Sequence, residues 1–310
     1  MGTVNFILNL AGLLLWLNWR SNRFDPLVKR SPATLMGTLR PAAPKRLQRW
    51  HLLAFIVALL LVRALVYWVI GGEANWSGKI DLGAAVLWFS TGPPWVGFLR
   101  LASWFGLFRM VVFSFMSFGL MLGVFYVCLL PLSLLAGPMP IHGLVTIPLG
   151  RVDGWPRWSK VILPFVATAL LWWLLTAPLA RLGVLTPTPM AGRVQQSIVL
   201  GLSSYLLWQY PLGAMLFLHL LNSYVYFGKH PIWKYANTTA QTILRPLRRI
   251  PLRVEKVDFA PLVGMVLIFG IAYVAQNGIK IHEHTGANGQ HVPPRIIVPG
   301  LVDIYARLPL

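Results

Sequence analysis

Apolar residues run along the chain in long blocks, and short polar stretches separate these blocks. A helix needs about 20 mostly apolar residues to cross the hydrocarbon core of a bilayer. The pattern therefore predicts an all-α, polytopic membrane protein. About six spans are expected, at about Val4–Trp19, His51–Ile70, Met110–Leu135, Val161–Leu175, Ser197–Phe227 and Phe259–Ala275. No basic stretch or small-residue cleavage site accompanies the first block, so we expect it to be a retained span.

The distribution of lysine and arginine predicts the orientation of the spans. Residues 20–49, 142–160 and 229–256 are rich in these cations, whereas the stretches that alternate with them are poor. Because basic loops stay in the cytoplasm, this alternation predicts three antiparallel hairpins with both termini extracytoplasmic. The bacterial cytoplasmic (inner) membrane is the expected location. In the fifth span, Pro211 is expected to produce a kink.

Composition supports a membrane location and argues against nucleic acid as a partner. Of the 310 residues, 56% are hydrophobic and 11% are charged, whereas about 25% of a soluble domain is charged. The net charge of +19 comes from cations that lie between the spans, a placement that favours lipid headgroups and topology over nucleic acid. The single cysteine, Cys128, excludes a disulfide within the chain.

Two interpretations are open for the outer segment between the second and third spans. The stretch PPWVGFLRLASWFGLF (93–108) mixes aromatic and small residues with one arginine, which is typical of a helix at the membrane surface. The alternative is an additional short span that includes the preceding LGAAVLWF (82–89). The N-terminal region, 1–108, thus comprises a hairpin with a basic cytoplasmic loop and this outer segment.

Two similar stretches indicate an internal repeat. IPLGRVDGWP (147–156) and IPLRVEKVDFAP (250–261) both contain Ile-Pro-Leu followed by Asp-x-x-Pro, with three intervening residues in the first and five in the second. Each precedes an apolar span. We therefore divide the remaining chain into repeats at 109–196 and 197–275 and a polar extracytoplasmic tail at 276–310.

The repeated motif has the chemistry of a helix start. Asp153 and Asp258 are expected to accept hydrogen bonds from the free N–H groups at the beginning of a helix. Pro156 and Pro261 then fall in the first turn, where a missing N–H has no cost. Pro246 and Pro251 are expected to keep the basic segment from forming a regular helix. Pro148 is the proline of Ile-Pro-Leu that the first repeat shares with the second.

The second repeat resembles the YggT family of small multi-pass bacterial membrane proteins, which includes the YlmG-type proteins of chloroplasts. The resemblance rests on PIWKYANTTAQTILRPLRRIP (231–251) and VDFAP (257–261), and the first repeat is a degenerate copy. His230 stands where the family has asparagine, and Ala260 where it has serine. The resemblance implies a non-catalytic role in the assembly or maturation of membrane complexes, including haem attachment to cytochrome b₆, or in osmotic tolerance.

The basic segment of the second repeat is the candidate docking site. Its cations are Arg245, Arg248, Arg249, Arg253 and Lys256. One interpretation is that they fix the topology and attract anionic lipids, which is worth about 1 kcal/mol per cation. The other is that they bind a partner, an integral membrane protein or a specific anionic headgroup.

Three polar residues within the predicted spans are candidate functional positions. Arg63 marks a functional site or reaches the membrane surface with its side chain. His219 and Asn222 are expected to form hydrogen bonds between helices, with a haem or metal role as the alternative. The tail contains further ligand-type residues, His282, Glu283, His284 and His291, in an arrangement that matches no zinc motif.

The sequence favours a scaffold, accessory or assembly subunit of a membrane complex. It contains no nucleophile–base motif, no phosphate-binding glycine loop and no paired carboxylates, so no enzymatic activity, metal or cofactor is expected. A small-ion channel or transporter linked to osmotic tolerance is one alternative, although the predicted spans contain no carboxylate. A haem or cytochrome maturation factor is another.

Overall fold

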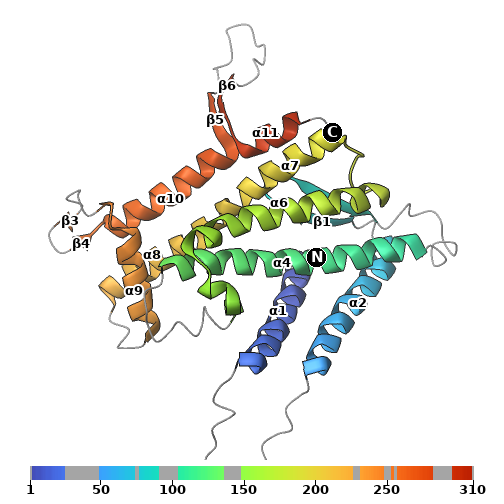
Figure 1. Ribbon diagram of the computed structural model, residues 1–310, viewed down its shortest axis with the longest axis horizontal. Coiled ribbons are helices and arrows are strands. Elements are labelled where there is room, and N and C mark those ends of the chain that lie inside the picture. The colour runs from blue at the N-terminus through green and yellow to red at the C-terminus, as the bar shows by residue number, and fades with distance from the viewer. Residues whose placement is uncertain are drawn as a thin grey trace, which may run out of the picture. The chain divides into compact units, whose positions relative to one another are not determined.

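A computed structural model describes most of the chain, and the described part is largely helical (Figure 1). The described residues are 2–24, 49–73, 77–90, 104–135, 148–225, 231–247, 253–254, 257–281 and 295–308. They form two compact units. The first comprises Met1–Gly78 and Phe89–Gly123, and the second comprises Lys79–Trp88 and Val124–Leu310.

Within the described residues, four helices are long and apolar enough to cross a membrane. They are α2 (Arg49–Glu73), α4 (Trp104–Leu135), α6 (Arg157–Arg181) and α10 (Ala260–Asn277). Each coincides with a predicted span. Only 17–28% of each apolar window is buried within the protein, so most of each apolar surface faces outward, as expected of helices in contact with lipid. The prediction of a helical membrane protein is therefore confirmed at these four positions.

The other two predicted spans are helical but do not meet the same limits of length and hydropathy. The first is α1 (Gly2–Phe24), whose apolar sequence is interrupted by Asn5, Asn9 and Asn18. The second is divided into α7 (Met190–Ser203), the 3₁₀ helix η5 (Ser204–Trp208) and α8 (Gln209–Tyr224). Pro211, which was expected to produce a kink, falls in the first turn of α8, where proline is tolerated. The irregular part of this segment is the 3₁₀ helix η5, which lies before Pro211.

The first unit is built on contacts among α1, α2 and the first part of α4. Helices α1 and α2 pack side by side. Ile56 and Leu60 from α2 pack with Phe118 from α4 in a small apolar core. Gly12 allows α1 to lie close to α4, because a Cβ at this position would be 2.8 Å from Cε2 of the Phe118 ring.

The second unit contains two groups of packed helices. Helix α6 packs against α7, while α8 packs against both α10 and α9 (Pro231–Ile243). Leu216, Ala240 and Leu244 form a buried cluster among α8, α9 and the turn that follows α9. Gly264 of α10 faces this cluster, because a Cβ at that position would lie 2.9 Å from Leu244 Cδ2.

The structure contradicts one of the two interpretations of the outer segment, because residues 82–89 do not form an additional span. Strand β1 (Ser77–Asp81) pairs with β2 (Val86–Ser90) in a two-stranded sheet. Gly83 has φ of 82° and donates its N–H to Asp81 Oδ1 at 2.9 Å, so the turn is closed by an aspartate side chain. In the predicted surface segment 93–108, residues 93–103 lie outside the described residues, and residues 104–108 begin α4.

The tail also has more structure than its polar composition predicts. Strand β5 (Gly278–Ile281) pairs antiparallel with β6 (Arg295–Pro299). Helix α11 (Leu301–Arg307) follows and packs against α10 and α7. Figure 1 shows the β5–β6 hairpin extending beyond the end of α10. His282, Glu283, His284 and His291 lie outside the described residues.

Candidate functional site

The basic segment starts where α9 ends. Arg245 and Pro246 are exposed in a turn directly after α9, as expected from a proline that ends a helix. Arg253 lies in strand β3 (Arg253–Val254), which pairs with β4 (Val257–Asp258) and places Arg253 opposite Asp258. The other predicted residues of this segment lie outside the described residues; they are Arg248, Arg249, Pro251 and Lys256.

Apolar packing fixes the beginning of this segment. Leu244 is 4% exposed and lies in the cluster with Leu216 and Ala240. Its N–H donates to Ala240 O at 2.8 Å, and its carbonyl accepts from Leu247 N–H at 2.9 Å. Consequently, the exposed Arg245 follows a residue that is buried between α9 and α10.

Asp258 accepts a hydrogen bond at the start of a helix, as predicted. Its Oδ1 accepts the N–H of Ala260, the first residue of α10, at 2.9 Å. Pro261 is the second residue of this helix and is buried. Asp258 therefore satisfies one of the free N–H groups of α10, and Pro261 occupies a position that needs no N–H.

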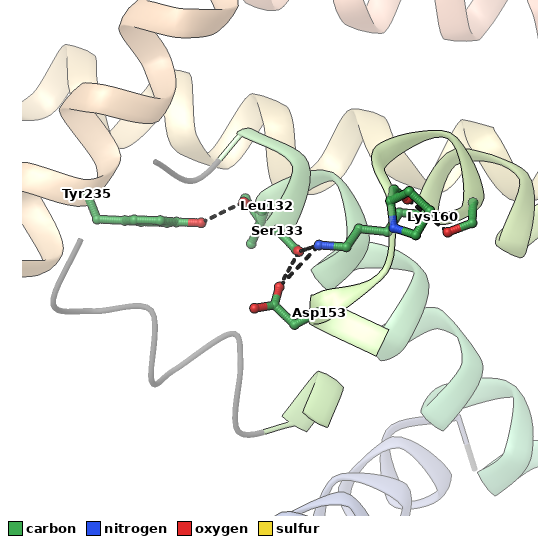
Figure 2. Close-up of polar contacts among 7 residues, drawn as sticks. Leu132, Ser133, Asp153, Lys160 and Tyr235 are labelled. Atoms are coloured by element: carbon green, nitrogen blue, oxygen red, sulfur yellow. Dashed lines mark hydrogen bonds and ion pairs between the residues drawn. The ribbon is translucent and has the colours of Figure 1, made fainter. Parts of the chain in front are cut away.

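Asp153 does not have the predicted capping role. It lies in the 3₁₀ helix η4 (Gly150–Gly154), and Pro156 is the residue that precedes α6. Asp153 Oδ1 instead accepts hydrogen bonds from Ser133 Oγ at 2.6 Å and from Lys160 Nζ at 3.3 Å. Figure 2 shows the Lys160 side chain reaching toward Ser133 and Asp153. The carboxylate of Asp153 thus pairs with the buried Lys160 and not with backbone N–H groups at the start of α6.

This Ser133–Asp153–Lys160 cluster is enclosed by the protein. The side chains of Lys160 and Asp153 are 8% and 16% exposed, and Lys160 Nζ also donates to Ser133 Oγ at 2.8 Å. A serine within hydrogen-bond distance of a lysine resembles a nucleophile and its base. However, the hydroxyl of Ser133 donates its proton to Asp153 Oδ1 and not to Lys160. The geometry therefore fits a structural ion pair between α4, η4 and α6.

Tyr235 of α9 contacts the same part of α4. Its hydroxyl donates to Leu132 O at 3.1 Å (Figure 2). Tyr235 also packs with Leu130 and Leu149, and Pro148 beside Leu149 is buried. Burial raises the pKa of the Tyr235 phenol; a hydrogen bond with Thr239 opposes this shift, and the charge of Asp153 adds to it.

His219 takes part in a contact between helices, as predicted. Its Nδ1 lies 2.9 Å from Asn237 Oδ1 and thereby links α8 to α9. Asn222 is half-buried further along α8. Among the described residues, no group of three or more histidine, cysteine, aspartate or glutamate side chains is placed to hold a metal ion.

Arg63 of α2 is buried and bonds to side chains of α1 and α4. Its side chain is 2% exposed. Nε donates to Ser114 Oγ at 2.9 Å and Nη2 donates to Ser114 O, while Nη1 donates to Asn5 Oδ1 at 3.2 Å and to Asn9 Oδ1. Ser117 completes the cluster by accepting from Asn5 Nδ2 at 3.1 Å and from Asn9 Nδ2 at 2.9 Å.

Most members of the Arg63 cluster and of the Ser133–Asp153–Lys160 cluster were not predicted from the sequence. Asn5 and Asn9 are four positions apart on α1, and Ser114 and Ser117 are three apart on α4, so each pair lies on one helix face. This spacing was a usable signal for a polar stripe inside an apolar helix. Lys160 was assigned to a cytoplasmic loop, whereas it lies in the first turn of α6.

Known proteins give no further guide to this arrangement. Comparisons with protein-family models, with curated proteins and with solved structures each found no significant match.

Proposed function

We propose that the protein is a non-catalytic integral membrane scaffold, an accessory or assembly subunit of a membrane protein complex. Two features support this role. The polar groups around Arg63, Lys160 and His219 bond to groups on neighbouring helices, which holds the helices together. The outward surfaces of the four apolar helices remain available to lipid or to partner helices.

The observation that carries the proposal is the anchored start of the basic segment. Leu244 is buried between α9 and α10, whereas the next residue, Arg245, is exposed. A rigid base reduces the conformational entropy that a docking segment loses on binding. Cations in such a segment are suited to anionic lipid headgroups or to the acidic surface of a membrane partner.

The proposal includes the topology expected from the sequence. Six helices in three hairpins would place the basic segments 20–49, 142–160 and 229–256 in the cytoplasm of a bacterium, with both termini outside. In this arrangement the last two hairpins are repeats of the YggT type. The alternation of basic and non-basic polar stretches along the chain supports this arrangement.

Charge reversal tests the docking role. A variant with Arg245, Arg248 and Arg249 all replaced by glutamate is purified with its surrounding lipid, and bound proteins and lipids are identified by mass spectrometry. We expect the variant to lose its co-purifying membrane partner and its enrichment in anionic phospholipid relative to the wild-type protein. The proposal fails if partner and lipid content are both unchanged.

A matched variant controls for the change in net charge. Lys79, Arg181 and Arg307 are exposed and lie outside all three basic segments. Replacing these three with glutamate changes the net charge by the same amount. We expect this control to retain the partner and the anionic lipid. An equal loss in both variants would assign the effect to net charge and would also refute a specific docking segment.

A further inference from the structure

Some hydrogen-bond donors of the Arg63 cluster have no acceptor among the described residues. A guanidinium has five N–H donors, and Arg63 makes four hydrogen bonds to described residues. One N–H of Nη2 therefore has no acceptor among them. Ser117 Oγ accepts from both Asn5 and Asn9, and within the described chain no acceptor receives the proton of its own hydroxyl. Unmatched buried donors cost free energy, which an additional acceptor would recover.

The cluster also lacks a compensating negative charge. The oxygens that accept from Arg63 belong to two amides, one hydroxyl and one peptide group, all of them neutral. In the described part of the chain, the ion pairs are Lys79–Asp81 and Lys160–Asp153, and neither includes Arg63. A positive charge enclosed in an apolar helix bundle is stabilised strongly by an opposite charge, because the local dielectric constant is low.

The cluster lies toward one end of the helices. Arg63 is seven residues before the end of the apolar window at Ile70, which corresponds to about 10 Å along a helix. Asn5 lies within the first turn of α1 and is half-buried, whereas Asn9 and Ser117 are buried. The free N–H groups of a helix start favour anions at this end.

We propose that the Arg63 cluster binds a small inorganic anion, with chloride as the probe. Arg63 supplies the charge and an N–H, Ser117 supplies a hydroxyl proton, and Asn5 supplies the second N–H of its Nδ2 amide. The inference is independent of the docking role of residues 245–256, because the cluster belongs to the first unit and the docking segment to the second.

The first test measures the full-length wild-type protein in detergent. Its thermal midpoint, Tm, is followed by tryptophan fluorescence while chloride replaces gluconate at constant ionic strength. A ligand that binds only the folded state raises Tm as its concentration exceeds Kd. We expect a saturable rise of a few degrees. A Tm that is the same in chloride and in gluconate would overturn the proposal, and this result needs no variant.

The second test places a carboxylate inside the cluster. In Asn9→Asp, the new charge neutralises Arg63 and removes the need for an external anion. Asn18→Asp is the matched control, because Asn18 lies exposed on the same helix and the net charge changes equally. Binding is measured by the broadening of the ³⁵Cl resonance. We expect Asn18→Asp to broaden it as the wild-type protein does and Asn9→Asp to broaden it less. Equal broadening by the two variants would refute the site.

Discussion

Lys160 and Arg63 are both cations enclosed by the protein, and they differ in what surrounds them. Lys160 donates to a carboxylate, Asp153, which lies seven residues earlier in the chain. Arg63 donates only to neutral oxygens among the described residues, and these come from positions 51 to 58 residues away. One cation is neutralised locally near the start of a helix. The other is stabilised by dipoles from two other helices.

This difference separates two ways of burying a charge in an apolar environment. An ion pair satisfies the charge itself, but breaking it leaves an unpaired buried charge. Neutral acceptors satisfy the hydrogen bonds of a buried cation but do not neutralise its charge. A site of this kind therefore favours an anion. The Lys160 cluster therefore suits a permanent structural contact. The Arg63 cluster suits both a contact between helices and the binding of a ligand.

The largest expected effect on stability comes from removing the carboxylate beside Lys160, so that this cation, like Arg63, has only neutral neighbours. Asp153→Asn preserves the shape but leaves the ammonium of Lys160 with neutral neighbours only. Loss of one partner from a buried ion pair costs about 3–5 kcal/mol. We expect a decrease of this size in the free energy of unfolding, measured by denaturant titration of the full chain in detergent.

An exposed pair on the same chain is the control for this prediction. Lys79 Nζ lies 3.9 Å from Asp81 Oδ2, and the two side chains are 50% and 60% exposed. An exposed pair contributes about 0–1 kcal/mol, so Asp81→Asn should have little effect. If Asp153→Asn were as mild as Asp81→Asn, the buried ion pair would not stabilise the protein.

Removing Arg63 should have a smaller effect than removing Asp153. Arg63→Leu leaves neutral amides and hydroxyls behind, and no buried charge loses its partner. Hydrogen bonds between membrane helices contribute about 0.6 kcal/mol each on average, so we expect a loss of about 2 kcal/mol. The same denaturant titration measures it. A loss larger than that of Asp153→Asn would show that Arg63 has an ionic partner that the neutral cluster does not account for.

The approach of α1 to α4 can be disturbed without changing a polar group. A Cβ at Gly12 would lie 2.8 Å from Phe118 Cε2, whereas a Cβ at Gly119 would meet nothing within 4 Å. Gly12→Ala should therefore cost about 1 kcal/mol through overpacking and weaken the contact that joins Asn9 to Ser117. Gly119→Ala should be neutral or stabilising, because alanine favours helix. Equal denaturation midpoints for the two variants would contradict the close packing at Gly12.

The smallest predicted effect is a pH dependence near the Lys160 cluster. Burial and the charge of Asp153 raise the pKa of Tyr235, with the Thr239 hydrogen bond opposing them. The folded protein therefore retains the phenol proton to higher pH than the unfolded chain. This contribution is complete below about pH 10, the ordinary value for tyrosine, and is lost as pH rises through the folded value.

Tyr235→Phe should make the Tm of the protein less sensitive to alkaline pH. We expect the wild-type Tm to fall more steeply than that of Tyr235→Phe between about pH 9 and about pH 11. Tyr210 is 59% exposed, and Tyr210→Phe provides the control with the same chemical change. Identical slopes for wild type and Tyr235→Phe would show that Tyr235 ionises alike in the folded and unfolded chains.

Features that depend on neighbouring residues were predicted well from the sequence. Long apolar runs predicted the four helices that are long enough to cross a membrane. Pro246 correctly marked the end of α9, and Asp258 with Pro261 marked the start of α10. These signals are local, because backbone geometry and helix termini depend on residues within one turn.

The two Asp-x-x-Pro motifs show where such local reasoning ends. Asp258 binds the first N–H of α10, whereas Asp153 in the same motif binds Lys160 and Ser133. Lys160 in the first turn of α6 offers a charge that a backbone N–H does not, and Ser133 comes from another helix. The choice of partner was therefore decided by tertiary packing, which the motif does not contain.

Two further features were beyond the sequence argument for different reasons. Residues 86–89 are all apolar, and an apolar run this short does not distinguish a strand from a helix. The neighbours of Arg63 lie on helices whose pairing the sequence does not specify. The role of residues 245–256 and the six-span topology remain proposals.

The most direct test uses two separate substitutions, one that replaces an amide with a carboxylate and one that replaces a carboxylate with an amide. Asn9→Asp adds a carboxylate beside Arg63, and Asp153→Asn removes one from Lys160, with almost no change in side-chain shape. The Tm of both variants is compared with that of the wild-type protein in chloride-free buffer. The account predicts that Asn9→Asp raises Tm and that Asp153→Asn lowers it. A lower Tm in both variants would contradict the claim that Lys160 is neutralised within the chain and Arg63 is not.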